Sequence, residues 1–480
     1  MTTDAQAFVK EIPSKAEQFS DWYTAVALKA ELADYSPVRG CMVIRPYGYA
    51  LWEGIQRWLD ERFKATGHVN AYFPLFVPES LLKKEAEHVE GFAPQVAWVT
   101  HGGDEELAER LAVRPTSEAI IMPMYAKWIQ SYRDLPVLLL QWNSVVRWEK
   151  STRLFLRTAE FLWHEGHTAH ATMEDADQEC LTILGIYRQL LEDVLAIPVL
   201  VGRKSPSERF AGADNTYTLE ALMPDSQAIQ TGTSHFLGQR FAKAFGVKFL
   251  DRDNTEKFVW STSWAVSTRL IGSLIMAHGD DRGLGLPPRI APIQVVIVPI
   301  FGKDGERVRA AAQQLAERLG KVARMRLDDR DEYTPGWKFN DWEMRGVPIR
   351  LEFGPREVAA GQAVLVKRTG GGKTTVSLQG IEQTITAALD EVQHAYFAQA
   401  KAFLDAHIVE AGTLDQLDAA IRERRGFVRT GWCEQQSCED AIRARTGASP
   451  RVIPLDDAPR GTCLACGKPS KATVYYARAY

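Results

Sequence analysis

The segment between Arg114 and His167 most constrains what this 480-residue chain can fold into. It interleaves arginines and carboxylates with apolar, strand-forming residues in three runs: Arg-Pro-Thr-Ser-Glu at 114–118, Arg-Trp-Glu at 147–149 and Phe-Leu-Arg-Thr-Ala-Glu-Phe-Leu-Trp-His-Glu-Gly-His at 155–167. Charges inside an apolar frame need partners, and a cluster of them usually surrounds a polar ligand. Because arginine and glutamate both recur, we expect a ligand that carries an anionic and a cationic group.

The composition is that of a globular protein, 45% hydrophobic and 25% charged, and the length allows two or three domains. The net charge of −4 excludes a global positive field, so any contact with nucleic acid must come from a local patch. The first ten residues do not form a signal peptide, and no apolar run is long enough for a bilayer. We therefore expect a cytoplasmic protein without a membrane segment.

Hydrophobic periodicity divides the chain into three predicted domains, at 1–285, 290–395 and 400–480. In the first, a run of strands flanked by helices predicts a large antiparallel sheet, which is an α+β pattern. After the glycine- and proline-rich segment 283–288, strands and helices alternate, which predicts a compact α/β domain of about 100 residues. The main elements expected are helices at 47–64, 265–278 and 381–407 and strands at 70–77, 137–148, 157–169 and 208–219.

The predicted strand 157–169 presents two chemically different faces. Pleat alternation puts Trp163, Glu165 and His167 on one face and His164 and His170 on the other. An aromatic ring, a carboxylate and an imidazole on one face suit a small-molecule pocket. A metal site is less favoured, because a spacing of three divides the histidines between faces and the His-Glu-x-x-His motif is missing.

Polar residues elsewhere in the chain allow a functional and a structural interpretation. Arg147 could hold a carboxylate or phosphate through paired donors, or form a structural ion pair with Glu149 or Glu118. Thr116 and Glu118 could accept both protons of a charged amine, while Pro-Thr-Ser-Glu is also a helix N-terminal signature. Gly-Gly-Lys-Thr at 371–374 lacks the earlier glycine of a phosphate-binding loop, so it predicts a hairpin turn.

Four of the six cysteines gather in the last fifty residues, as Cys433-x4-Cys438 and Cys463-x2-Cys466. Four thiolates suit a closed tetrahedral zinc site, which leaves no vacancy for catalysis by the metal. The alternative is a pair of disulfides, which is less favoured for a chain without a secretion signal.

Together these segments resemble the class II aminoacyl-tRNA synthetases, specifically the prolyl-tRNA synthetases of the archaeal and eukaryotic-like type. Residues 40–63, with Pro46, are similar to motif 1, the dimer-interface helix of that class. Residues 147–149 with 155–167 match motif 2, 264–272 match motif 3, and the run from Arg114 to Glu118 matches the proline-binding loop. The resemblance covers nearly the whole chain. It implies a homodimer with an antiparallel-sheet catalytic domain, an α/β anticodon-binding domain and a small zinc-containing α/β C-terminal domain.

The resemblance also implies the reaction: ATP-dependent activation of L-proline to prolyl-adenylate, with Mg²⁺ on the ATP phosphates, and transfer to tRNA(Pro). Arg147 and Arg269 would be the catalytic pair that neutralises charge around the α-phosphate. The family's terminal tyrosine, here Tyr480, points back toward the active site. The implied binding residues are, for proline, Thr116, Glu118, Arg147, Trp163, Glu165, His167, His235 and Phe92; for ATP, Arg147, Glu149, Arg157, Thr158, Gln230, Thr233 and Arg269; for the anticodon, Phe339, Glu343 and Arg350; and for structural Zn²⁺, Cys433, Cys438, Cys463 and Cys466.

Two departures from the family pattern matter. Only residues 169–257 separate motifs 2 and 3, too few for the editing insertion of bacterial-type members, so hydrolysis of mischarged alanine by this chain is not expected. Ala265 stands in a stretch that is commonly glycine-rich, with little expected effect on Arg269.

Three alternative functions are weaker. The same fold could charge threonine or serine, but the catalytic domain lacks the additional cysteine–histidine set expected for a threonine-binding zinc. A synthetase-like protein that binds tRNA or a partner without catalysis should have lost the motif arginines, yet Arg147 and Arg269 are present. A basic nucleic-acid module conflicts with the charge balance, and the local cluster Arg422, Arg424, Arg425 and Arg429 equally suits a solvated helix face.

Overall fold

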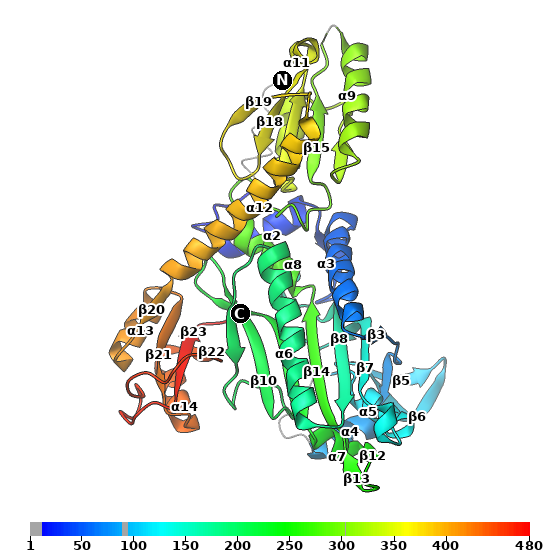
Figure 1. Cartoon of the computed structure of the whole chain (residues 1–480), viewed down its shortest axis with the longest axis vertical. Coiled ribbons are helices and arrows are strands. Elements are labelled where there is room, and N and C mark those ends of the chain that lie inside the picture. Colours follow the sequence, from blue (N-terminus) through cyan, green and yellow to red (C-terminus); the bar gives the residue numbers. More distant parts are fainter. Residues whose placement is uncertain (1–11, 89–94, 303) are drawn as a thin grey trace.

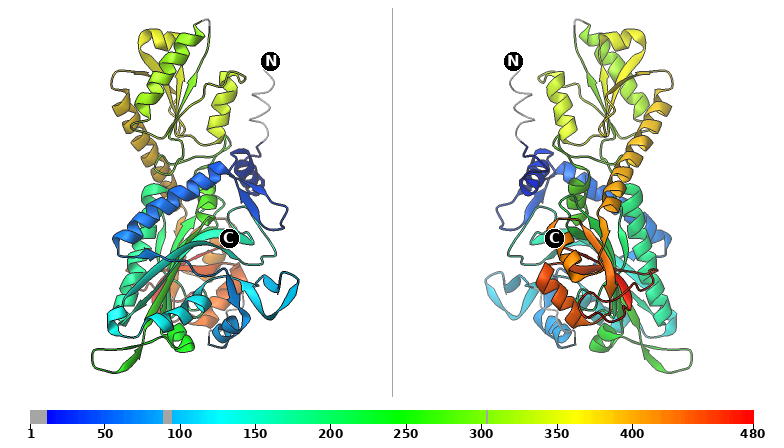
Figure 2. Two further views of the ribbon diagram at one scale, coloured as in Figure 1. Left: turned by 90° about the vertical axis from the view of Figure 1, so that its right-hand side faces the viewer. Right: turned by 90° about the vertical axis from the view of Figure 1, so that its left-hand side faces the viewer.

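The computed structural model describes residues 12–88, 95–302 and 304–480. A large sheet with its helices forms the body of the molecule, and a smaller five-stranded unit forms a lobe at one end (Figure 1 and Figure 2). The long helix α12 (Ile381–Ala406) leaves this lobe, passes the body and leads to a C-terminal unit beside the large sheet (Figure 1). Among the described residues, no helix is long and apolar enough to cross a membrane.

The large sheet has eleven strands, in the order β20-β21-β23-β22-β9-β10-β11-β14-β8-β7-β3. From β9 to β7 all neighbours are antiparallel, which confirms the predicted antiparallel sheet. The parallel pairs lie at the two edges of the sheet, β3 with β7 and β20 with β21. The strands of the body are β3 (Val69–Asn70), β7 (Val137–Val146), β8 (Glu160–His170), β9 (Leu200–Arg203), β10 (Asn215–Leu222), β11 (Ala228–Gly238) and β14 (Trp260–Ser267).

Helices cover one face of this sheet and bury the main core. In α3 (Pro46–Ala65) a proline at the first position starts the helix, and Leu51, Ile55, Leu59 and Phe63 form a buried stripe. Beside it lie α2 (Phe19–Lys29), α6 (Met173–Gln189), a π-helical turn (Leu190–Val194) and α8 (Arg269–His278), and α6 crosses β10, β11 and β14. The opposite face of the sheet is therefore free to carry a binding site.

Smaller elements complete the body on that opposite side and at its edges. They include α5, whose first residue is Glu118, and a second apolar core beneath it. These elements are β1 (Ala33–Tyr35), β2 (Met42–Ile44), β4 (Phe76–Pro78), α4 (Glu79–His88), β5 (Trp98–Gly102), β6 (Glu105–Val113), α5 (Glu118–Trp128), a short 3-10 helix (Tyr132–Asp134), α7 (Arg240–Phe245), β12 (Lys248–Leu250) and β13 (Glu256–Phe258).

Three predicted elements were wrong in extent, among them the strand expected at 208–219, which begins only at Asn215. The strand expected at 70–77 is two short strands, β3 and β4, in different sheets, because Pro74 offers no backbone N–H and the N–H of Phe73 bonds to the Gln141 side chain at 3.0 Å. The helix expected at 265–278 begins only at Arg269, because Ala265 belongs to β14, where it lies between Thr233 and Glu165 of the neighbouring strands.

The five-stranded unit has the order β16-β15-β17-β18-β19, parallel among the first three and antiparallel after β17. Strands β18 and β19 form the hairpin predicted around 371–374. Segment 283–288, which joins this unit to the body, is buried, and Arg368 fastens it by donating 2.6 and 2.8 Å hydrogen bonds to Asp280 and one of 3.1 Å to the carbonyl of Leu284. The elements are β15 (Val295–Pro299), α9 (Gly305–Leu319), β16 (Met325–Leu327), α10 (Pro335–Met344), β17 (Ile349–Phe353), α11 (Pro355–Ala360), β18 (Gln362–Lys367) and β19 (Lys373–Ser377).

The C-terminal unit is joined to the body through a shared sheet. Its strand β22 pairs antiparallel with β9, with Ile453 opposite Arg203 and Pro454 opposite Gly202. The approach is so close that a Cβ at Gly202 would lie 2.2 Å from the Ile453 carbonyl oxygen, which requires glycine there. The elements are β20 (Ile408–Glu410), α13 (Leu414–Arg422), β21 (Phe427–Trp432), α14 (Gln436–Thr446), β22 (Ser449–Pro454) and β23 (Ala472–Ala477).

Candidate active site

A cavity of about 240 Å³ lies on the face of the large sheet opposite α6. Strand β8 shows how the two faces divide: His164 contacts Tyr187 of α6 at 3.0 Å, whereas Trp163, Glu165 and His167 line the cavity. The alternation read from the sequence therefore places these side chains as expected. The predicted residues that meet around the cavity are Thr116, Glu118, Arg147, Trp163, Glu165, His167, Gln230, Thr233, His235 and Arg269.

A buried carboxylate, Glu118 at the start of α5, offers a place for a cation. Thr116 Oγ1 donates a 2.5 Å hydrogen bond to Glu118 Oε2, and His167 Nε2 lies 3.3 Å from Oε1. Burial would raise the pKa of Glu118, but His167 and the Thr116 hydroxyl outweigh it and lower this pKa. Burial would lower the pKa of His167, but its contact with Glu118 raises it instead. The free site thus holds a buried pair of Glu118 and His167 in which each side chain favours the charged form of the other, and Glu118 is anionic.

The run Pro-Thr-Ser-Glu does precede a helix, α5, as its N-terminal signature predicts, but Thr116 does not cap that helix. Ser117 is the N-cap residue of α5, and its side chain makes no capping bond. The Ser117 hydroxyl and its backbone N–H instead donate to Glu165, the latter at 3.2 Å. Thr116 is therefore left to support Glu118.

Glu165 holds this turn in place from the sheet. Besides the two bonds from Ser117, it accepts hydrogen bonds from Gln141 Nε2 at 3.0 Å and Asn143 Nδ2 at 2.8 Å. The ligand atoms of Glu118, Glu165 and His167 lie close enough to hold a metal ion. We assign no metal there, because four donors already satisfy Glu165, and Thr116 and His167 already contact Glu118.

Two arginines face the same cavity without a carboxylate partner. Arg147 Nε donates to the Pro115 carbonyl at 3.1 Å, and Arg269 Nε donates to the Leu156 carbonyl at 3.3 Å. Within the described ranges neither forms an ion pair, so the alternative of a structural pair between Arg147 and Glu149 or Glu118 is not found. Burial lowers the pKa of both guanidinium groups, and the charge of Arg147 lowers that of Arg269 further. Two such cations without carboxylate partners form a receptor for an anion.

The remaining predicted residues lie in different places. A second hollow of about 460 Å³ adjoins Arg147 and is lined by Glu149 and Arg157, which pair with each other at 2.7 Å. Thr158 lines neither hollow, and its hydroxyl donates to the Glu160 carbonyl at 2.7 Å. Phe92 lies outside the described residues.

Sequence reasoning missed one wall of the cavity. The strand expected at 208–219 begins only at Asn215, and residues 205–213 form a loop whose members Glu208, Arg209 and Phe210 line the cavity. The ring of Phe210 packs 4.7 Å from that of His235, whose pKa burial lowers to about 4, so this imidazole is neutral. No pattern in the sequence indicates where such a loop folds.

Phe161 is another missed residue, and here a signal existed. It lines the cavity and lies 5.5 Å from the guanidinium of Arg147. Because it precedes Trp163 by two on β8, the same alternation could have placed it.

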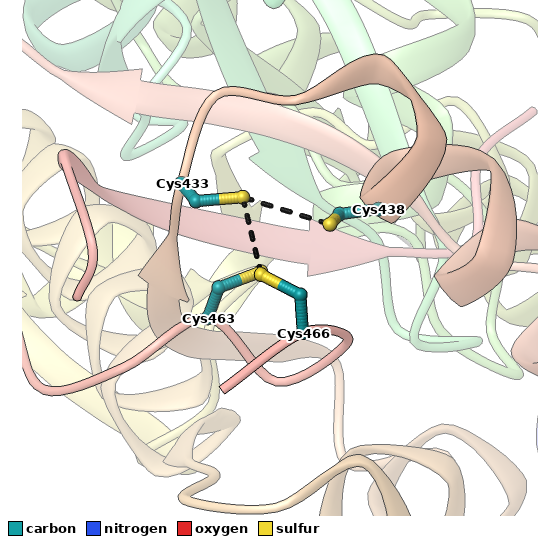
Figure 3. Close-up of side chains that lie close together, drawn as sticks. All are labelled: Cys433, Cys438, Cys463 and Cys466. Atoms are coloured by element: carbon teal, nitrogen blue, oxygen red, sulfur yellow. Dashed lines mark hydrogen bonds between the residues drawn. The ribbon is translucent and has the colours of Figure 1, made fainter. Parts of the chain in front are cut away.

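The four clustered cysteines converge in the C-terminal unit (Figure 3). Cys433 Sγ lies 3.6 Å from Sγ of Cys438 and 3.6 Å from Sγ of Cys466, and all four sulfurs lie within 4.8 Å of one another. Four sulfurs at about 2.3 Å from a tetrahedral zinc ion would be about 3.8 Å apart, so the residues fit the metal. All four are free thiols, so the disulfide alternative is not found.

Two groups of predicted residues lie away from the cavity. In the five-stranded unit, Arg350 stacks 4.3 Å from the Phe339 ring, whereas Glu343 pairs with Arg282 of the body at 2.8 Å. Tyr480 lies at the start of β11, where its hydroxyl donates to Asp225 at 2.6 Å and its backbone N–H donates to the Ala228 carbonyl at 3.2 Å. Strand β11 carries Gln230 and Thr233 into the cavity.

Comparison with known proteins fits this arrangement. Family models match over residues 98–278 ("tRNA synthetase class II core domain (G, H, P, S and T)"), 294–388 ("Anticodon binding domain") and 414–480 ("Prolyl-tRNA synthetase, C-terminal"). Proline–tRNA ligases of Natranaerobius thermophilus and Alkaliphilus oremlandii are 54% and 55% identical, with 100% of both chains covered in each case. That of Symbiobacterium thermophilum is 54% identical over 99% of this chain and 100% of its own. The chain belongs to the proline–tRNA ligase family of class II aminoacyl-tRNA synthetases.

Proposed function

We propose that the cavity on the large sheet is where this chain joins L-proline to ATP and then passes the prolyl group to tRNA(Pro). The reaction, activation of proline and charging of tRNA(Pro), is that of the family. The assignment of roles to side chains rests on one observation: a single cavity holds a buried anionic carboxylate and two arginines without carboxylate partners. A zwitterionic amino acid beside a polyphosphate is the ligand that matches both.

For proline, Glu118 and Thr116 would hold the secondary ammonium, which carries two protons for two acceptors. Arg147 would hold the carboxylate. The apolar ring needs apolar walls, and Trp163 and Phe210 supply them, with the neutral His235 packed against Phe210. His167 would release Glu118 to the incoming ammonium, because two cations cannot both be neutralised by one buried carboxylate.

For ATP, Arg269, Gln230 and Thr233 lie in the same cavity, and Glu149 and Arg157 line the hollow that adjoins it at Arg147. A proline carboxylate oxygen attacks the α-phosphorus, a new P–O bond forms, and the bond to the pyrophosphate oxygen breaks. The negative charge that gathers on the α-phosphate oxygens is neutralised by Arg147 and Arg269. Placement of both reactants in one cavity supplies much of the rate, and no protein nucleophile is required.

Two metal ions would accompany this chemistry. Glu149 offers a carboxylate oxygen beside the proposed phosphate site, which is the kind of ligand that Mg²⁺ takes together with phosphates, and bound Mg²⁺ would add positive charge there. The four cysteines would hold Zn²⁺ as a closed structural site, since four protein ligands leave no open position.

For tRNA, the anticodon-binding domain would use Phe339 and Arg350, which already stack, and Glu343 after it leaves Arg282. Charging of tRNA in translation supports a cytoplasmic site of action.

A homodimer would form around motif 1. Large apolar side chains are exposed there on β1, β2, α3 and β3 and just after β3, and a second copy of the chain would cover them. In sedimentation experiments the wild type should have the mass of a dimer and Val43→Asp that of a monomer. A wild type that sediments as a monomer would contradict the assignment. The exposed residues are Tyr35, Val43, Tyr49, Val69 and Tyr72.

The decisive experiment is ATP–pyrophosphate exchange with each of the twenty amino acids. Proline alone should support exchange, and Arg147→Ala should abolish it while the circular dichroism spectrum stays unchanged. Exchange with threonine or serine in place of proline would overturn the substrate. Wild-type exchange in Arg147→Ala would overturn the role of that arginine.

A further inference from the structure

The loop at residues 205–213, here called the pocket loop, connects β9 to β10 and forms a wall of the cavity through Glu208, Arg209 and Phe210. Two of its polar side chains bond to the C-terminal unit. The Ser207 hydroxyl donates to Glu439 of α14, and Glu208 accepts from Arg443 of the same helix.

A buried charge cluster pins the start of the loop to the same unit. Arg451 of β22 donates to Glu208 at 3.2 Å and to both oxygens of Glu220 at 3.0–3.1 Å. Lys204 Nζ donates to Glu220 at 2.5 Å and to the backbone carbonyl of Arg451 at 3.0 Å. Lys204, Glu220 and Arg451 are all buried, so this cluster has few ways to rearrange.

These contacts and the shared ladder between β9 and β22 put the C-terminal unit directly against the pocket loop; Figure 1 shows the unit lying beside β10. Helix α14 is itself fixed at its first turn by Cys438 of the cysteine cluster, and Glu439 is the next residue. A continuous set of contacts therefore runs from the cysteine cluster to Phe210 in the cavity.

We propose that the C-terminal unit is a positioning element for amino-acid binding: Glu439, Arg443 and Arg451 hold the pocket loop in the form that closes the proline pocket. The inference deepens the proposed function and rests on it. None of these three side chains lines the cavity, so they are positioning residues. When they release the loop, Phe210 leaves His235 and the ring pocket opens to water. The KM for proline should rise, while turnover at saturating proline should stay.

The test uses the full-length, zinc-loaded protein and compares Ser207→Ala, Arg443→Ala and the double variant. Arg443→Ala alone should act weakly, because the pair with Glu208 is partly exposed to solvent. The matched control is Arg445→Ala on the same helix, since Arg445 pairs with Asp415 and Asp418 of α13 and not with the pocket loop. Steady-state pyrophosphate exchange gives KM for proline and kcat, and hydrogen exchange of residues 205–213 reports the loop directly.

The double variant should raise KM for proline about tenfold, the change that corresponds to about 1.4 kcal/mol, with kcat within about twofold. Amide exchange of residues 205–213 should become faster, zinc content should stay at one per chain, and Arg445→Ala should match the wild type. An unchanged proline KM and unchanged loop protection in the double variant would overturn the inference. Protection of the loop amides is measured without substrates. It therefore tests the positioning role even if the wild type showed no proline-dependent pyrophosphate exchange and the proposed function were wrong.

Discussion

Replacement of Glu118 by glutamine tests the central electrostatic assignment. The substitution keeps the size and one acceptor oxygen of the side chain but removes the charge that would bind the proline ammonium. Because Glu118 is 2% exposed, solvent screens this charge poorly, and its loss should be felt in full.

The expected size follows from the geometry. Two unit charges about 4 Å apart in a medium of effective dielectric constant about 20 interact by about 4 kcal/mol, an upper bound on the loss. The net loss should be smaller, because the carboxylate of the free enzyme already has His167 as a partner. A hydrogen bond to a charged group contributes about 1.5–3 kcal/mol net, and we take this as the expected loss. At 1.4 kcal/mol per factor of ten, KM for proline should rise by about 10- to 100-fold. KM for ATP should stay within about twofold, as Glu118 faces the amine.

The assay is proline-dependent pyrophosphate exchange, with inhibition by tetrahydrofuran-2-carboxylate as the matched ligand. That compound has the ring and the carboxylate but an oxygen in place of the amine, so Glu118→Gln should not weaken its inhibition. Glu160→Gln, an exposed carboxylate on the same strand as His167, is the control variant. Equal losses for proline and the oxygen analogue, or a KM for ATP that rises as much as that for proline, would falsify the assignment.

Three further predictions concern stability. Glu118→Gln should lower the melting temperature more near pH 6 than near pH 9, and melting curves at both pH values check this. Glu118 raises the pKa of His167 in the fold, so the pair stabilises the fold below the unfolded pKa of histidine, about 6.5, and this stabilisation is lost as the pH rises through the folded pKa. The lowered pKa of Glu118 contributes equally at both pH values. Gly166→Ala should lower stability by about 1–3 kcal/mol in urea unfolding, because its Cβ would lie 2.2 Å from the Trp264 ring, whereas Gly185→Ala on α6 meets nothing within 4 Å and should not. Chelation of zinc should unfold the C-terminal unit and raise KM for proline, seen by circular dichroism and exchange kinetics; full activity after metal loss would contradict a structural zinc.

Local patterns in the sequence predicted several residues of the two candidate sites. Alternation on one strand placed Trp163, Glu165 and His167 together because the pleat has a fixed period of two, and spacing alone grouped the four cysteines. Arg147 and Arg269 were paired through family motifs, not through physics, because they lie far apart in the chain and no local rule brings them together.

The pocket loop and the C-terminal contacts could not be read from the sequence. Phe210 reaches the cavity only because Ser207 and Glu208 find partners more than two hundred residues later, and such long-range pairs leave no periodic trace. The strand expected at 208–219 was wrong before Asn215, because the backbone N–H groups there bond within the loop: those of Glu208 and Arg209 donate to the Ser205 carbonyl and that of Phe210 donates to Thr216 Oγ1, so no ladder forms.

The pairing of β22 with β9 also affects the tendency of the protein to aggregate. In a shortened chain that ended after α12, β9 would become the outermost strand of the sheet, and its unpaired N–H and C=O groups would be open to strands of other molecules. Bare edges of this kind promote aggregation. Residues 407–480 cover this edge, and a trimmed enzyme that lacked them should aggregate more readily than the full chain.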